Sequence, residues 1–257
     1  MDKNKVDKRG QAMIWVIVAL ALSAIIILFF VLREKVKLEI PEKIEEDPKG
    51  FIDECTRRNV NEAVDLILPQ GGFVRPEHAK TYNGINVSYL CYNKGNYLPC
   101  VNEHPLFLSE MKDEIKNYIR PKIDKCFYDY KAEMEKRQNE VSLREMKLDV
   151  ELGPERIYVD IDRKISINKE DGSLSVNIFD AEIISPVYDL GRVAMEIASQ
   201  EAEYCYFEYN GYMILYPKYK IKLTQMSDST RIYSITDKKS GKEINIAVRG
   251  CAIPPGL

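Results

Sequence analysis

The sequence predicts an α+β protein in which an N-terminal transmembrane helix precedes an ectodomain of packed helices and an antiparallel sheet with a covering helix. Three observations lead to this prediction. Residues 12–32 form an apolar run without a charged side chain, and about 20 such residues span the hydrocarbon core of a bilayer. Apolar residues then recur at helical spacing as far as residue 134. From residue 146 they alternate with polar ones, so that helices and strands occupy separate parts of the chain.

The apolar run divides the chain into five expected segments. These are a cytoplasmic tail at 1–11, a transmembrane helix at 12–32, a stalk at 33–47, a mainly helical subdomain at 48–140 and an antiparallel sheet subdomain at 141–257. The tail carries four lysine and arginine residues, which the positive-inside tendency keeps in the cytoplasm. We therefore expect a single-pass protein of the cell membrane with a cytoplasmic N-terminus and an extracellular C-terminal domain.

Residues 48–140 carry the signals of two helices and one strand. Asp47 and Pro48 form a good helix start, with Asp as N-cap and proline at the first helical position. This helix should end at 69–72, and a short strand follows at 87–92. A second helical stripe runs from Leu108 to Met134. Because proline removes an amide donor, Pro121 predicts a kink or break near Arg120.

Residues 141–257 show the alternation of a half-buried sheet. Three antiparallel strands are expected at 146–152, 157–167 and 174–183. In the last of them the apolar residues change from even to odd positions at Phe179, which indicates a bulge. Ser185 and Pro186 should start a helix that covers this sheet. Further on, a strand is predicted at 219–223, and residues 232–236 should pair with 243–248 across the turn at 237–241.

Six cysteines without a CxxC spacing favour disulfides, which require an oxidising compartment. Cys55 and Cys126 lie on helix stripes that must pack together, and Cys91 and Cys100 flank the turn-forming residues 93–96. Cys205 is then left for Cys251. Six cysteines allow 15 connectivities, and six free buried thiols in a cytosolic domain are the alternative interpretation.

Motifs of the common enzyme and cofactor classes are absent from the sequence, which contains no GxGxxG, GxxxxGK, HExxH or GxSxG. We therefore assign no catalytic residue, no metal site and no cofactor. Cys100 and His104 would supply only half of a zinc site. The formal net charge of −3 also argues against nucleic acid as a partner, because phosphate binding needs a basic face.

Acidic side chains on the predicted sheet are the one candidate for hydrolytic chemistry. They lie opposite the apolar set and could cluster across strands, where carboxylates act as acids and bases or bind calcium. A solvated sheet face explains the same pattern. The residues are Asp149, Glu151, Asp160 and Asp162.

Two further signals concern the surface. Asn86 begins an Asn-Val-Ser sequon, which marks a candidate glycosylation site. The tyrosine-rich stretch 204–219 is a candidate surface for protein or glycan recognition, because tyrosine combines a large apolar body with a polar tip. Core packing beside Cys205 is the alternative. The candidate binding residues are Tyr204, Tyr206, Tyr209, Tyr212 and Tyr216.

Residues Lys8-Arg9-Gly10-Gln11 and the apolar run after them resemble an archaeal class III signal peptide of type IV pilin-like proteins. That resemblance implies cleavage between Gly10 and Gln11 with the helix retained. The segments Phe51-Ile52-Asp53-Glu54-Cys55, Gln70-Gly71-Gly72-Phe73 and Cys126-Phe127-Tyr128 are similar to a group of uncharacterised membrane-anchored archaeal surface proteins. This second resemblance implies a bitopic surface protein.

Three functional hypotheses follow. The leading one is a non-enzymatic structural or interaction protein, anchored in the lipid bilayer, that binds a protein or glycan at the cell exterior. The second is a pilin-like subunit that is processed after Gly10 and assembles as a homo-oligomer in a filament or in an envelope complex. The third is an extracytoplasmic hydrolase that uses the carboxylates of the sheet.

Overall fold

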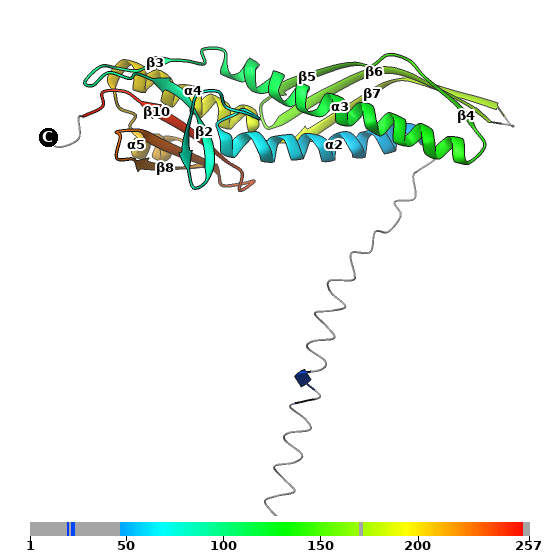
Figure 1. Cartoon of the computed structure of the whole chain (residues 1–257), viewed down its shortest axis with the longest axis horizontal. Helices are drawn as coiled ribbons and strands as arrows, with labels where there is room; N and C mark the ends of the chain where they lie inside the picture. The colour runs from blue at the N-terminus through cyan, green and yellow to red at the C-terminus, as the bar shows by residue number, and fades with distance from the viewer. Residues whose placement is uncertain (1–19, 21, 24–46, 170–171, 254–257) are drawn as a thin grey trace, which may run out of the picture. The chain divides into compact units, whose positions relative to one another are not determined.

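The computed structural model describes residues 20, 22–23, 47–169 and 172–253 (Figure 1). The predicted tail, nearly all of the predicted transmembrane helix and residues 33–46 of the stalk lie outside this set. Within the described residues, no helix has the length and apolar character needed to cross a bilayer. The fold is α+β with two sheets, and residues 45–257 form one compact unit.

Two long antiparallel helices support the first sheet. α2 (Pro48–Ile67) is capped by Asp47, whose carboxylate accepts hydrogen bonds from the amides of Lys49 and Gly50. α3 (Phe107–Lys136) runs alongside, with the rings of Phe51 and Tyr130 5.4 Å apart.

α3 is a single helix, so of the kink or break expected near Arg120 the break is absent. The buried stripe of α3 explains this outcome, because Ile115 and Ile119 before the proline and Ile123 after it are all fully buried. Packing of a continuous apolar face on both sides of the proline outweighs the one helical hydrogen bond that proline cannot make.

The first sheet is antiparallel. It contains β4 (Glu140–Leu143), β5 (Lys147–Gly153), β6 (Arg156–Lys169) and β7 (Gly172–Ile184), and β6 pairs with the other three. The predicted bulge is present, but the extra residue lies in β6. Asp162 pairs with Ile178 and Ile165 with Val176, which leaves two residues of β6 opposite one of β7. The inner face of the sheet packs against the helices, as the edge-to-face contact of Phe127 with Phe179 shows.

The second sheet joins distant parts of the chain. Its order is β1 (Ala79–Tyr82), β2 (Ile85–Tyr92), β10 (Glu243–Arg249), β9 (Arg231–Asp237) and β8 (Tyr219–Gln225), and β3 (Val101–Asn102) also pairs with β2. β2 and β10 are parallel, whereas β9 and β10 form the antiparallel hairpin predicted from the sequence.

This mixed sheet departs from the prediction in two ways. A single antiparallel sheet was expected, and the structure has two sheets, one of which contains a parallel pair. A boundary was also expected between 48–140 and 141–257, yet β2 from the first part pairs with β10 at the end of the second. The physical reason is that residues 87–91 of β2 are all buried. A strand buried on both faces carries no alternation from which its partner can be inferred.

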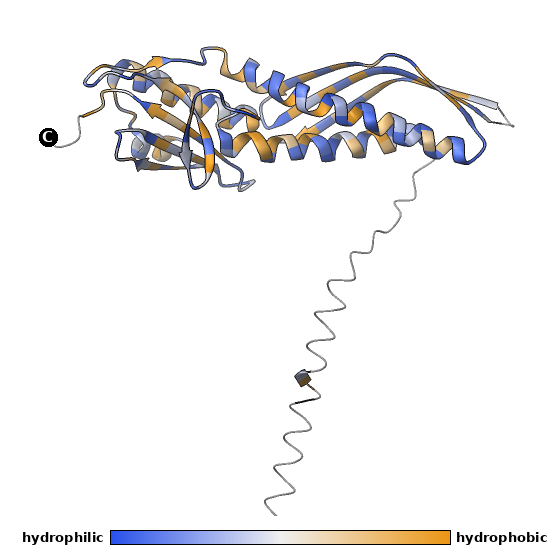
Figure 2. Ribbon diagram, in the orientation of Figure 1, coloured by the Kyte–Doolittle hydropathy of each residue, from blue (hydrophilic) through white to orange (hydrophobic). Residues whose placement is uncertain are grey.

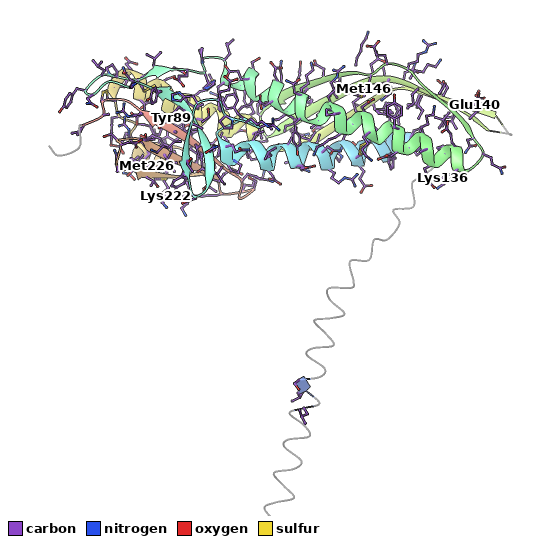
Figure 3. The ribbon with its side chains drawn as sticks, in the orientation of Figure 1. Tyr89, Lys136, Glu140, Met146, Lys222 and Met226 are labelled. Carbon is purple, nitrogen blue, oxygen red and sulfur yellow. A yellow bond between two sulfur atoms is a disulfide. The ribbon has the colours of Figure 1, made fainter. Side chains whose placement is uncertain are left out.

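The mixed sheet has apolar side chains on both faces. On one face, Val87, Tyr89, Ile232 and Ala247 form a buried cluster against which Met226 packs. Figure 3 labels Tyr89, Met226 and Lys222 in this part of the molecule, and Lys136, Glu140 and Met146 around the first sheet. The hydropathy colours of Figure 2 show the apolar central strands of the mixed sheet and the apolar stripe along α2.

α4 (Val187–Tyr204) covers the other face of the mixed sheet. It starts directly after Ser185 and Pro186, as predicted. It was expected to cover the first sheet, but its contacts are mainly with β2, β9 and β10 of the mixed sheet. A second, short helix, α5 (Tyr209–Leu215), follows and contacts β8.

The Gln-Gly-Gly turn connects α2 to the mixed sheet through the 3-10 turn η1 (Leu68–Gln70). Gly71 and Gly72 have φ angles of 79° and 94°, which side chains other than glycine rarely adopt. A Cβ atom on Gly72 would also lie 2.7 Å from the ring of Phe107. Both glycines are therefore required where the end of α2 meets α3 and β2.

Candidate binding site

The three disulfides have the pairing that we expected from the sequence. They join Cys55 to Cys126, Cys91 to Cys100 and Cys205 to Cys251, with Cα–Cα distances of 6.5, 5.3 and 5.9 Å. The first links α2 to α3, the second closes the segment after β2, and the third connects the end of α4 to the residues after β10. The tyrosine-rich segment is thus covalently attached to the C-terminal end of the mixed sheet.

A buried ionic cluster reinforces this third connection. Arg231 on β9 donates hydrogen bonds to the carbonyl oxygens of Cys205 (2.7 Å) and Gly250 (3.0 Å). Its guanidinium also lies 2.7 Å from the carboxylate of Glu201 on α4. The hydroxyl of Tyr233 donates to the other oxygen of that carboxylate. Arg231 therefore binds both chain segments that the disulfide joins, one at Cys205 and the other at Gly250.

The carboxyl of Glu201 is fully buried. Burial raises its pKa above the usual value, although the Tyr233 hydroxyl and the Arg231 guanidinium act in the opposite direction. Burial likewise raises the pKa of Tyr233. These groups stabilise the end of α4, where the tyrosine-rich segment begins, and they lie in the interior rather than on the binding surface.

The five candidate tyrosines all lie on this supported segment, and their exposure differs. Tyr204, Tyr206 and Tyr216 are each about half exposed or more, whereas Tyr209 and Tyr212 are partly buried. Phe207 points inward and is fully buried, with its ring against those of Tyr212 and Tyr233. The segment thus contributes both to the core and to the surface.

α5 adds an apolar surface that the sequence analysis missed. None of its residues is buried, and Ile214 and Leu215 at its end are 80% and 75% exposed. The helix has only seven residues and contains Gly211, so it gives almost no periodic signal. The one indication in the sequence is Glu208, which caps the helix by accepting hydrogen bonds from the amides of Asn210 and Gly211.

A groove of about 470 Å³ lies between α4 and α5. One wall is polar and comes from α4, and the other is aromatic and comes from α5 and the residues beside it. The rings of Tyr212 and Tyr216 are 4.6 Å apart, and those of Tyr212 and Tyr219 are 6.4 Å apart and stacked. Burial raises the pKa of Tyr212 to about 12, so its hydroxyl is protonated near neutral pH. The groove is lined by Arg192, Glu196, Gln200, Tyr212, Leu215 and Tyr216, among others.

The remaining predicted site residues lie elsewhere. Gly10 and Gln11 are outside the described residues. Asn86 is exposed in β2, and its side-chain oxygen accepts a hydrogen bond from the hydroxyl of Thr81. Cys100 is engaged in a disulfide, so it does not form a zinc site with His104.

The candidate carboxylates share the exposed face of the first sheet. Asp149 lies directly opposite Asp160, which in turn lies opposite Asp180. The Lys116 ammonium, 2.8 Å away, holds the pKa of the Asp149 carboxyl below its usual value, which disfavours a role as general acid. Among the residues that the structure describes, no group of three or more acidic, histidine or cysteine side chains is arranged to hold a metal ion.

Comparisons with known protein families, with curated proteins and with solved structures find no match to this chain.

Proposed function

We propose that the protein is a membrane-anchored extracytoplasmic interaction protein whose ectodomain binds a protein or a glycan partner at α5. The observation that carries this proposal is the exposure of Ile214 and Leu215 on a helix with no buried residue, beside the partly exposed tyrosines 204, 206 and 216. Exposed apolar and aromatic side chains that gather in one place are typical of interaction sites.

The covalent and hydrogen-bonded attachment of the chain before α5 supports the proposal of a binding surface there. The Cys205–Cys251 disulfide and the hydrogen bonds of Arg231 fix the start of the segment that leads into α5 against the residues that follow β10. A surface that is already ordered loses little conformational entropy when a partner binds. The buried cluster of Arg231, Glu201 and Tyr233 holds the end of α4, from which this segment continues.

Three observations support the position outside the cell and the anchor. Three disulfides are typical of proteins that fold in an oxidising compartment. The apolar run at 12–32 is long enough to span a bilayer. α2, with 20 residues, is about 30 Å long, and η1 at its end contacts β2 and β10. The helix thus separates the mixed sheet from the place where the chain enters the folded unit.

A site-specific cross-link tests the proposal. A photoreactive amino acid is introduced at position 215 of the full-length protein in intact cells, and a matched chain carries it at Tyr128, which is exposed on α3. We expect a discrete cross-linked product at 215 and none at 128. Equal products at both positions, or none at either, would refute binding at α5.

The location is tested with a membrane-impermeant amine reagent on intact cells. Exposed lysines of β8, such as Lys220 and Lys222, should react before lysis. Labelling that appears only after lysis would place the folded unit inside the cell and refute the extracytoplasmic assignment.

A further inference from the structure

The two walls of the groove between α4 and α5 offer different kinds of contact. Arg192, Glu196 and Gln200 follow one another at intervals of four residues and so share one face of α4. Gln200 donates a hydrogen bond to the carboxylate of Glu196 (2.6 Å). No ion pair within the described part of the chain engages Arg192, so its N–H groups are available to a ligand.

The opposite wall is a set of rings held in place by one another. The ring centroid of Tyr212 lies 4.6 Å from that of Tyr216, 6.4 Å from that of Tyr219 and 5.3 Å from that of the buried Phe207. Tyr216 remains about half exposed. The exposed part of the Tyr216 ring, which packs against Tyr212, is an apolar surface that binds a ligand with little further loss of side-chain freedom.

We propose that this groove binds a neutral oligosaccharide, an inference that rests on the proposed function and names the class of its partner. A pyranose ring has an apolar C–H face and an edge of hydroxyl groups. The Tyr216 ring matches the face, while the edge of hydroxyls needs both donors and acceptors. Arg192 supplies donors, Glu196 supplies acceptors and the Gln200 amide supplies both.

The charge balance of the groove favours a neutral ligand over an anionic one. Arg192 and Glu196 carry opposite charges, and Lys218 at the end of the groove is already paired with Asp189 at 3.2 Å. No excess of positive charge is left to select a sulfate or a uronic acid. A volume of about 470 Å³ also lies within the range of small-ligand sites, roughly 300–1,000 Å³.

The test uses the full-length protein in detergent micelles. The probes are immobilised oligosaccharides of two to six units, either neutral hexoses and N-acetylhexosamines or uronic acid-containing chains. We expect binding to members of the neutral set. The dissociation constant of each neutral hit is then measured by titration calorimetry for the wild type and for variants.

Variants locate the binding. Tyr216→Ala and Arg192→Ala should each weaken binding about ten-fold or more, because they remove the ring and the donors. Tyr216→Phe should retain binding, because it keeps the ring. Tyr128→Ala is the matched control, since Tyr128 is about as exposed as Tyr216 but lies on α3 and does not line the groove. Equal affinities in the wild type, Tyr216→Ala and Arg192→Ala would overturn the assignment to this groove.

The remaining outcomes separate this inference from the proposed function. A cross-link at position 215 to a protein, with no binding of neutral oligosaccharides, overturns the glycan assignment and leaves the interaction surface standing. Binding of the uronic acid chains alone overturns the argument from charge balance. Absence of both the cross-link and the glycan binding refutes the two proposals together.

Discussion

Removing the Cys55–Cys126 disulfide should destabilise the folded unit more than removing Cys91–Cys100. The perturbation is a pair of double substitutions, Cys55→Ala with Cys126→Ala and Cys91→Ala with Cys100→Ala, so that no free thiol remains. All four cysteines are buried to a similar extent, with 5%, 5%, 0% and 4% of their surface exposed. The local cost of losing the sulfur atoms should therefore be similar in the two variants.

The difference comes from the loops that the disulfides close. Their sequence separations are 71 and 9 residues. In the chain-entropy description, a cross-link stabilises by restricting the unfolded chain, which amounts to about 4.4 kcal/mol for the longer loop and about 2.6 kcal/mol for the shorter one. The free energies of unfolding of the two variants should thus differ by about 2 kcal/mol.

Urea denaturation of a chain that lacks residues 1–36 measures this difference. The free energy of unfolding of each variant is extrapolated to water and compared with that of the oxidised parent. A Cys205→Ala, Cys251→Ala variant, with a separation of 46, should fall between the two but closer to the first. If loss of Cys91–Cys100 costs as much as loss of Cys55–Cys126, loop length does not govern the effect and the reasoning fails.

Three other predictions concern single features. Gly72→Ala should destabilise by about 1–3 kcal/mol more than Gly84→Ala in urea denaturation, because both glycines have positive φ but only Gly72 faces a ring; equal losses would exclude the contact. Burial raises the pKa of Glu201 above its usual 4.5, so this carboxyl stabilises the fold below that pH and its contribution is lost as the pH rises through the raised value. Glu201→Gln should therefore flatten the pH dependence of the unfolding free energy above pH 4.5, and an unchanged slope would contradict the assignment. If residues 8–15 act as a class III signal, intact mass spectrometry of the membrane-extracted protein should find a chain that begins at Gln11, and a chain that begins at residue 1 or 2 would exclude processing.

Local signals in the sequence were sufficient to predict much of the fold. Asp47 caps α2 because its side chain and the following proline suit a helix start, and this can be read from two residues. The hairpin of β9 and β10 follows from alternation around a short turn. The cysteine pairing also depended on local context, namely two helix stripes and one turn, with the third pair left over.

Features that depend on distant partners could not be predicted in this way. β2 is buried on both faces, and its Tyr89 pairs with Ala247 of β10, 158 residues later, so neither the spacing of its apolar residues nor its sequence neighbours indicate β10. Arg231 and Glu201 look like ordinary surface charges in the sequence, yet they meet in the interior. Of the kink or break expected near Arg120, the break is absent, because packing outside the helix determines whether a proline is tolerated there.

The candidate site was predicted only in part. The tyrosines were identified by their density in the sequence, and three of the five candidates are about half exposed or more, whereas Tyr209 and Tyr212 are partly buried. The groove depends on the polar face of α4 lying beside α5, which is a tertiary relation between residues 192–200 and 212–216. The exposed pair Ile214 and Leu215 would be taken for core residues on hydropathy alone.

The position of β10 has a consequence for how the chain matures. It is the last strand in the part of the chain that the structure describes, yet it lies inside the mixed sheet between β2 and β9. Until residues 243–249 have emerged, β2 presents an open edge and Cys205 has no partner in Cys251. The mixed sheet therefore cannot be completed before residues 243–249 are available to pair with β2 and β9. β10 closes the sheet, and a chain truncated before residue 243 would present unpaired strands to its neighbours rather than a shortened version of the same fold.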